Sequence, residues 1–248
     1  DTEPREKMNS NVKKINIPKD YIKQRPKSPD LEELLKVKSE FITMASVGDK
    51  SLLQAITALE KNDSVLARDV IELEPKILDF ERLIERRCML ILLYQQPVAS
   101  DLRMVSAIMK MISELRHLSN QDTEISELII TNHTKIHFGE VEELVEMGQK
   151  VRRMTYEAIH AFSVSDERLA RQVVSQDDEV DNLFTNANKM IVKGIKTDAV
   201  KPGTGVDALM ISKHMEKIGD YSVAMAAWTI YMITNEPVET ILASSTNS

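Results

Sequence analysis

The strongest constraint on the fold is a repeat inside the chain. Residues 63–78, DSVLARDVIELEPKIL, align without gaps on residues 166–181, DERLARQVVSQDDEVD. The positions that match are mainly apolar, as expected for side chains that face a core, and both stretches follow a helical period. Self-similarity at such a spacing is typical of repeated structural units, so we predict two copies of one helical unit in tandem.

Each copy contains three helical stretches, because apolar residues follow the helical period three times in each half. In the first copy they cover residues 31–61, 64–94 and 102–130, and in the second 140–162, 166–195 and 206–234. Pro75 should kink or break the second stretch, and Gly48 could perturb the first. Short turns make neighbouring helices antiparallel. We therefore expect an all-α fold of two tandem three-helix bundles with an extended N-terminal arm.

The predicted boundaries follow from this pattern. Residues 1–30 are polar, contain four prolines, and are expected to form an extended or disordered leader. The first repeat is expected at residues 31–136 and the second at 137–236. Residues 237–248 are expected to be a mostly polar tail.

Composition excludes several classes of protein. Aromatic residues make up only 4% of the chain, which favours helices over sheet. A net charge of -7 leaves no general electrostatic footprint for nucleic acid, and no apolar run is long enough for direct membrane insertion. Cys88 is the only cysteine, so no internal disulfide or cysteine zinc site can form, and we expect a buried thiol in a cytosolic, reducing setting.

Two acidic pairs with helical spacing are the main candidate site. Asp177 and Asp181 lie four residues apart, as do Glu216 and Asp220, so each pair shares one face of a helix. Both pairs lie near the rims of apolar stripes, and they converge if the two helices pack side by side. Oxygen ligands suit Mg²⁺, Mn²⁺, iron and also zinc. The alternative is that both pairs simply face water.

The first repeat lacks this set of carboxylates. Glu74 and Leu78 stand opposite the two aspartates, while Arg116 and Asn120 stand opposite Glu216 and Asp220. Such a site should repel a cation. We predict that Glu74 pairs with Arg116, so that a guanidinium replaces the metal, with exposure of both side chains to water as the alternative.

Two Glu-x-x-His steps raise the question of whether the chain could form a di-iron centre. Glu114 and His117 form one step, and Glu157 and His160 form the other. Di-iron bundles direct such residues inward, whereas Glu114 and His117 fall opposite the apolar stripe of their helix. The sequence also lacks a glycine-rich phosphate loop, a nucleophile elbow and an HExxH motif. We therefore expect no enzymatic activity.

Three motifs remain to be explained: QQPVASDLRMV at the turn between the second and third stretches, DDEVDNLF, and HMEKIGDYS. They resemble motifs of the PhoU family of phosphate-transport accessory proteins. The resemblance covers residues 31–236 and implies two three-helix repeats without catalytic activity. It also implies negative regulation of the phosphate regulon through a phosphate ABC transporter ATPase and a sensor histidine kinase. We expect a cytoplasmic homo-oligomer, in the form of a dimer.

The resemblance further implies metal clusters of iron or zinc on the acidic motifs, one in each repeat. Carried over residue by residue, the second-repeat set is Asp177, Asp181, Glu216 and Asp220. The first set does not carry over, and Tyr221 stands where the family often has His, so we expect one cluster or none. The alternatives are a metal-dependent hydrolase or oxidase on these carboxylates, and a helical scaffold that only oligomerises.

Overall fold

The described part of the chain consists of helices joined by short turns. The computed structural model describes residues 31–95, 97–131 and 141–245, and it contains no strand within these ranges. The helices are α2 (Leu31–Lys61), α3 (Ser64–Ile71), α4 (Glu74–Tyr94), α5 (Ala99–Thr131), α6 (Glu142–Val164), α7 (Glu167–Val174), α8 (Asp177–Lys196), α9 (Pro202–Thr234) and α10 (Val238–Ser245).

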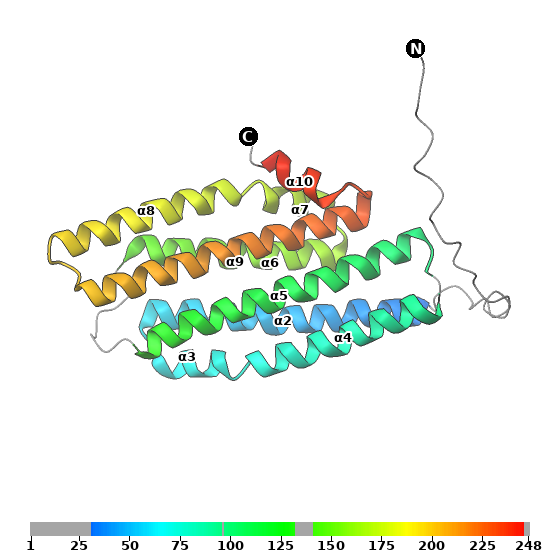
Figure 1. Cartoon of the computed structure of the whole chain (residues 1–248), viewed down its shortest axis with the longest axis horizontal. Helices are drawn as coiled ribbons and strands as arrows, with labels where there is room; N and C mark the ends of the chain where they lie inside the picture. The colour runs from blue at the N-terminus through cyan, green and yellow to red at the C-terminus, as the bar shows by residue number, and fades with distance from the viewer. Residues whose placement is uncertain (1–30, 96, 132–140, 246–248) are drawn as a thin grey trace, which may run out of the picture.

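The predicted architecture is confirmed. Helices α2 to α5 form one bundle and α6 to α9 form a second, and the two lie side by side with their long axes aligned (Figure 1). The N-terminal arm, residues 1–30, lies outside the described residues. The boundary expected near residue 136 falls within residues 132–140, which also lie outside them.

The middle helix of each bundle is broken at the same place. Asp63 and Asp166 cap the short helices α3 and α7, and their carboxylates accept backbone N–H groups of Leu66 and Leu169 at 3.0 Å. In the first repeat Pro75 lies in the first turn of α4, as predicted. The second repeat breaks before Asp177 without a proline, although the sequence favours one continuous helix there.

The two bundles pack through two antiparallel helix pairs. In the pair formed by α5 and α9, the Arg103 Nε donates to the Met232 carbonyl at 3.4 Å, near the last turn of α9. In the pair formed by α2 and α6, the rings of Phe41 and Phe162 meet edge to face with centroids 4.8 Å apart. One continuous core therefore joins the repeats.

Small residues and sulfur side chains complete this core. Helix α2 runs through Gly48 without interruption. A Cβ at Gly48 would lie only 2.8 Å from Leu115 Cδ1, so the glycine lets α5 pack closely against α2. Cys88 is buried as expected, and burial raises the pKa of its thiol to about 12.

The end of the chain is more structured than its polar composition suggests. Residues Val238–Ser245 form α10, which packs on α9 and buries Ile241. None of the helices that the structure describes has an apolar stretch sufficient to cross a lipid bilayer.

Candidate functional site

The four predicted carboxylates lie along the contact between α8 and α9. Asp177 and Asp181 occupy the first two turns of α8, on either side of the buried Val180. Glu216 and Asp220 lie on α9, on either side of Gly219. A Cβ at Gly219 would lie 3.2 Å from Val180 Cγ1, so the glycine allows close packing of the two helices. This close packing brings the two acidic pairs together.

Three of the four carboxyl groups have raised pKa values. Partial burial and, after it, the charges of Glu216, Asp177 and Asp181 together raise the pKa of Asp220 to about 6. Burial also raises the pKa of Asp177, followed by the charges of Asp181, Asp178 and Glu216. The pKa of Asp181 is raised by burial and then mainly by Glu216. The four groups are therefore within electrostatic reach of one another.

A lysine on α9 partly compensates this negative charge, and sequence reasoning overlooked it. The Nζ of Lys213 forms an ion pair with Glu216 Oε2 and lies 5.3 Å from the centre of the Phe184 ring. Its charge lowers the pKa values of Asp181 and Asp220. The sequence did contain a signal for this ion pair, because Lys213 precedes Glu216 by three residues and so lies on the same helix face.

The four side chains offer suitable donor atoms for a metal ion, but they are not arranged to bind one. Oxygen donors from Asp177, Asp181, Glu216 and Asp220 fit a hard or borderline cation. Yet no three acidic, histidine or cysteine side chains in the described ranges are arranged to hold a metal ion. The Lys213 ammonium group is already paired with Glu216. As they lie, the side chains do not form a ligand set, and a cation would have to compete with Lys213.

In the first repeat the predicted partner of Arg116 is wrong. The Arg116 Nε pairs with Glu81 Oε2 at 3.2 Å, two turns along α4 from Glu74. Glu81 aligns with Phe184 in the second repeat. A cation lies beside each of these residues: Arg116 forms an ion pair with Glu81, and Lys213 lies over the ring of Phe184. The predicted replacement of a metal by a guanidinium paired with Glu74 does not occur.

The first Glu-x-x-His step faces the seam between the two repeats rather than open water. The His117 ring stacks on Tyr221 of α9 with centroids 5.6 Å apart. One helical turn farther along α5, Gln121 Oε1 lies 2.8 Å from His214 Nδ1. Burial raises the pKa of Tyr221, and the negative charges of Glu114 and Asp220 raise it further. Tyr221 thus joins the two repeats beside the acidic pairs.

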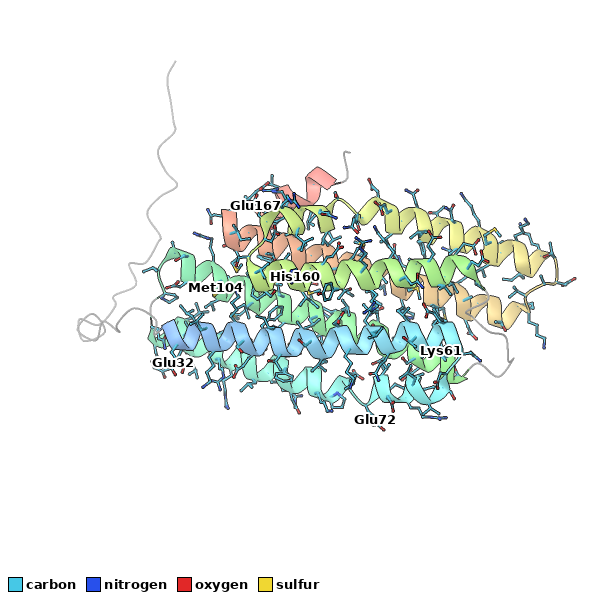
Figure 2. All side chains as sticks on the ribbon, turned by 180° about the vertical axis from the view of Figure 1, so that it is seen from behind. Glu32, Lys61, Glu72, Met104, His160 and Glu167 are labelled. Atoms are coloured by element: carbon cyan, nitrogen blue, oxygen red, sulfur yellow. The ribbon has the colours of Figure 1, made fainter. Side chains whose placement is uncertain are left out.

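The second Glu-x-x-His step lies in the other layer of the molecule. Figure 2 shows His160 on α6, in the layer behind α5 and α9 of Figure 1. Its ring stacks on Tyr156, while Glu157 pairs with Arg153 at 2.9 Å. The two steps therefore do not converge.

Comparison with known proteins identifies the family. Residues 41–129 and 144–229 each match the PhoU domain, so the match includes both bundles. The chain belongs to the PhoU family. A PhoU homologue of Clostridium acetobutylicum, named a phosphate-specific transport system accessory protein, is 30% identical over 211 residues. That match covers 85% of this chain and 95% of the relative. The PhoU protein of Escherichia coli is 26% identical, and the match covers 82% of this chain and 85% of that protein.

Solved PhoU structures show the same fold. The crystal structure of PhoU from Pseudomonas aeruginosa superposes with a TM-score of 0.77 at 28% identity, covering 83% of this chain and 99% of that chain. The phosphate transport system regulatory protein PhoU from Streptococcus pneumoniae gives a TM-score of 0.74 at 25% identity, with coverages of 84% and 97%. The resemblance seen in the three sequence motifs is thereby confirmed.

Proposed function

We propose that this PhoU family member is a non-enzymatic regulator that couples phosphate uptake to signalling. The observation that carries the proposal is the PhoU domain in both bundles, in a chain whose relatives are named accessory proteins of phosphate transport. In this role it links the ATPase of a phosphate ABC transporter to a sensor histidine kinase and negatively regulates the phosphate regulon. It acts in the cytoplasm, where the ATPase and kinase domains of such partners lie.

The second-repeat carboxylates are proposed as a regulatory metal site for iron or zinc. The support is physical: beside partial burial, the neighbouring carboxylate charges raise the pKa values of Asp177, Asp181 and Asp220, and a bound cation would relieve this repulsion. The first repeat supports no such site, because Arg116 and Asn120 stand at two of the four positions.

Deletion of the gene in its host tests the regulatory role. We expect phosphate-starvation genes to be expressed at high phosphate in the deletion strain, and the full chain supplied in trans to repress them. Unchanged expression would overturn the proposal. An Asp181→Asn, Asp220→Asn variant, compared at equal protein level, shows whether regulation requires the carboxylates.

The purified protein distinguishes this role from the enzymatic alternative. We expect no turnover of phosphoesters, and no oxygen consumption with iron, in samples whose metal content is known. Turnover that Asp181→Ala abolishes would instead establish a metal-dependent hydrolase or oxidase on the same carboxylates.

A further inference from the structure

A groove lies between α2 of the first repeat and α6 of the second. Its volume is about 620 Å³, which is within the roughly 300–1,000 Å³ typical of small-molecule sites. Figure 2 shows the two helices side by side, with Lys61 at the end of α2 and His160 on α6. The acidic pairs lie at a different contact, between α8 and α9. The groove is therefore separate from the candidate metal site.

The register of the two helices gives the groove two different ends. Gln149 Nε2 donates to Glu60 Oε1 at 3.0 Å, so polar groups close one end. Leu53 precedes Glu60 by two helical turns and Tyr156 follows Gln149 by two turns, so antiparallel packing places both at the other end, about 10 Å away. Tyr156 is 55% exposed and Leu53 is 40% exposed. That end offers an aromatic ring and an aliphatic side chain to a ligand.

Arg152, between these ends, carries a charge that no neighbour pairs. Its side chain is half-buried, and its Nε is shielded from water without a hydrogen-bond acceptor. Burial raises the pKa of Asp49 and the charge of Arg152 offsets part of that rise, yet the two form no ion pair among the described residues. A shielded donor without an acceptor is costly. An anion in the groove would supply the missing acceptor.

Arg153 adds a second guanidinium to the same groove. Its Nε donates to Glu157 Oε1 at 2.9 Å, and Glu157 Oε2 accepts from Gln176 Nε2 at 3.1 Å. These contacts hold the Arg153 side chain through its Nε and leave its two terminal nitrogens without a partner in the described part of the chain. Guanidinium groups donate in a fork that matches the oxygens of a phosphate group. The middle of the groove is therefore suited to a phosphate.

The repeat shows that the two arginines are not required by the packing of α2 on α6. When the alignment of residues 63–78 on 166–181 is continued without gaps toward the N-terminus, Asp49 and Lys50 of α2 stand opposite Arg152 and Arg153 of α6. The matching positions on α2 therefore carry one acid and one lysine, with no guanidinium. The concentration of positive charge is specific to the α6 side of this seam.

We propose that the groove binds a nucleoside monophosphate, with its phosphate on Arg152 and Arg153 and its base on Tyr156. A base stacks on an aromatic ring, and Leu53 adds apolar contact at the same end. The volume is far larger than one phosphate ion needs, and it accommodates a nucleotide. Glu60 lies beyond the arginines, where its carboxylate repels the additional phosphates of a triphosphate. The inference goes beyond the proposed regulatory function and does not depend on it.

Titration calorimetry on the full chain tests the site, with adenosine monophosphate (AMP) as the probe. We expect one AMP bound per chain, and adenosine, inorganic phosphate and ATP each to bind at least ~10-fold more weakly, because each lacks one contact or adds a repulsion. Arg152→Gln should weaken AMP binding at least ~10-fold through loss of a charge-assisted hydrogen bond. Tyr156→Ala should weaken AMP binding at least ~5-fold through loss of stacking, and should leave the binding of inorganic phosphate unchanged.

Two matched variants control the experiment. Tyr156→Phe keeps the ring and should bind AMP nearly as well as the unmodified protein, while Arg82→Gln removes an exposed arginine of α4 and should change nothing. Absence of saturable binding at millimolar AMP would overturn the proposal, and so would an affinity that Arg152→Gln and Tyr156→Ala leave intact. Inorganic phosphate that binds as tightly as AMP would also overturn it, because the groove would then recognise the anion alone.

Discussion

One residue in the core differs sharply between the repeats. Asp122 on α5 is 0% exposed, and within the described residues neither carboxyl oxygen accepts a well-directed hydrogen bond. Burial raises its pKa well above the ordinary value, and Asp49 raises it further, with partial compensation by the Ser51 hydroxyl. Its counterpart on α9 is Ser222, whose hydroxyl lies 2.8 Å from that of Thr155. The first repeat thus buries an acid where the second buries a paired hydroxyl.

Asp122 should make the protein less stable as pH rises. The unfolded chain loses this proton near pH 4, whereas the folded chain retains it to a higher pH. The contribution to stability is therefore fully present below pH ~4 and declines until the pH reaches the raised folded pKa. Asp122→Asn should remove this slope and increase the free energy of unfolding at neutral pH by about 2 kcal/mol. Urea unfolding between pH 5 and pH 8 measures both effects.

The control for this prediction is Asp69→Asn, at an exposed position on α3. It should leave both the slope and the stability close to those of the unmodified protein. An Asp122→Asn variant with an unchanged slope would show that the folded state accommodates the charged carboxylate.

Lys213 should limit the affinity of the acidic site for cations. Its ammonium group pairs with Glu216 and lowers the pKa values of Asp181 and Asp220. Lys213→Ala removes a charge that competes with the metal, and about 1 kcal/mol of Coulomb energy at contact distance corresponds to ~5-fold tighter binding. Titration calorimetry with Zn²⁺ and elemental analysis measure the change.

The control is Lys189→Ala, an exposed lysine farther along α8. This change should leave the affinity for zinc nearly unaltered, and Asp181→Asn should weaken binding in either background. Equal zinc binding by the unmodified, Lys213→Ala and Asp181→Asn proteins would contradict the placement of a metal at these carboxylates.

At the scale of elements, the spacing of α8 and α9 sets the charge density of the site. Gly219→Leu places a side chain where even a Cβ would lie 3.2 Å from Val180, so the helices must move apart. We expect a loss of about 2 kcal/mol in stability. The pKa of Asp220, now about 6, should fall as its burial decreases and as Asp177 and Asp181 on α8 recede. Denaturation and carboxyl NMR titration measure the two effects.

Gly203→Ala is the matched glycine control. A Cβ at Gly203 meets no atom within 4 Å, and the residue lies in the first turn of α9. This variant should be as stable as the unmodified protein or slightly more stable, because alanine favours a helix. An unchanged Asp220 pKa in Gly219→Leu would show that helix spacing does not determine the electrostatics.

The sequence predicted the helices better than the contacts between them. Helical periodicity placed the end of the first helix at Lys61, and the i, i+4 spacing identified four carboxylates that share one helix–helix contact. The partner of Arg116 depends on the axial register of α4 against α5, which no local pattern fixes, so Glu81 could not be distinguished from Glu74. The break before Asp177 has no proline signal. The helical period therefore predicted one continuous helix over residues 166–195, and the structure divides it.

At the scale of the whole molecule, the two repeats form one structural unit. The contact between α5 and α9 carries polar links, such as Gln121 with His214, and the contact between α2 and α6 carries the Phe41–Phe162 pair. Lys110 of the first repeat lies 6.0 Å from the centre of the Trp228 ring in the second. Because the core is continuous across this seam, neither bundle should unfold alone.

Phe41→Ala tests this coupling across the seam. Phe41 is 0% exposed, and its removal should reduce the free energy of unfolding by about 3–5 kcal/mol. Trp228 is the chain's only tryptophan and lies in the other repeat, so its fluorescence reports unfolding at a distance from the substitution. We expect the fluorescence and circular-dichroism transitions in urea to coincide and to shift together. A Trp228 transition that stays in place while circular dichroism becomes biphasic would show that the repeats fold independently.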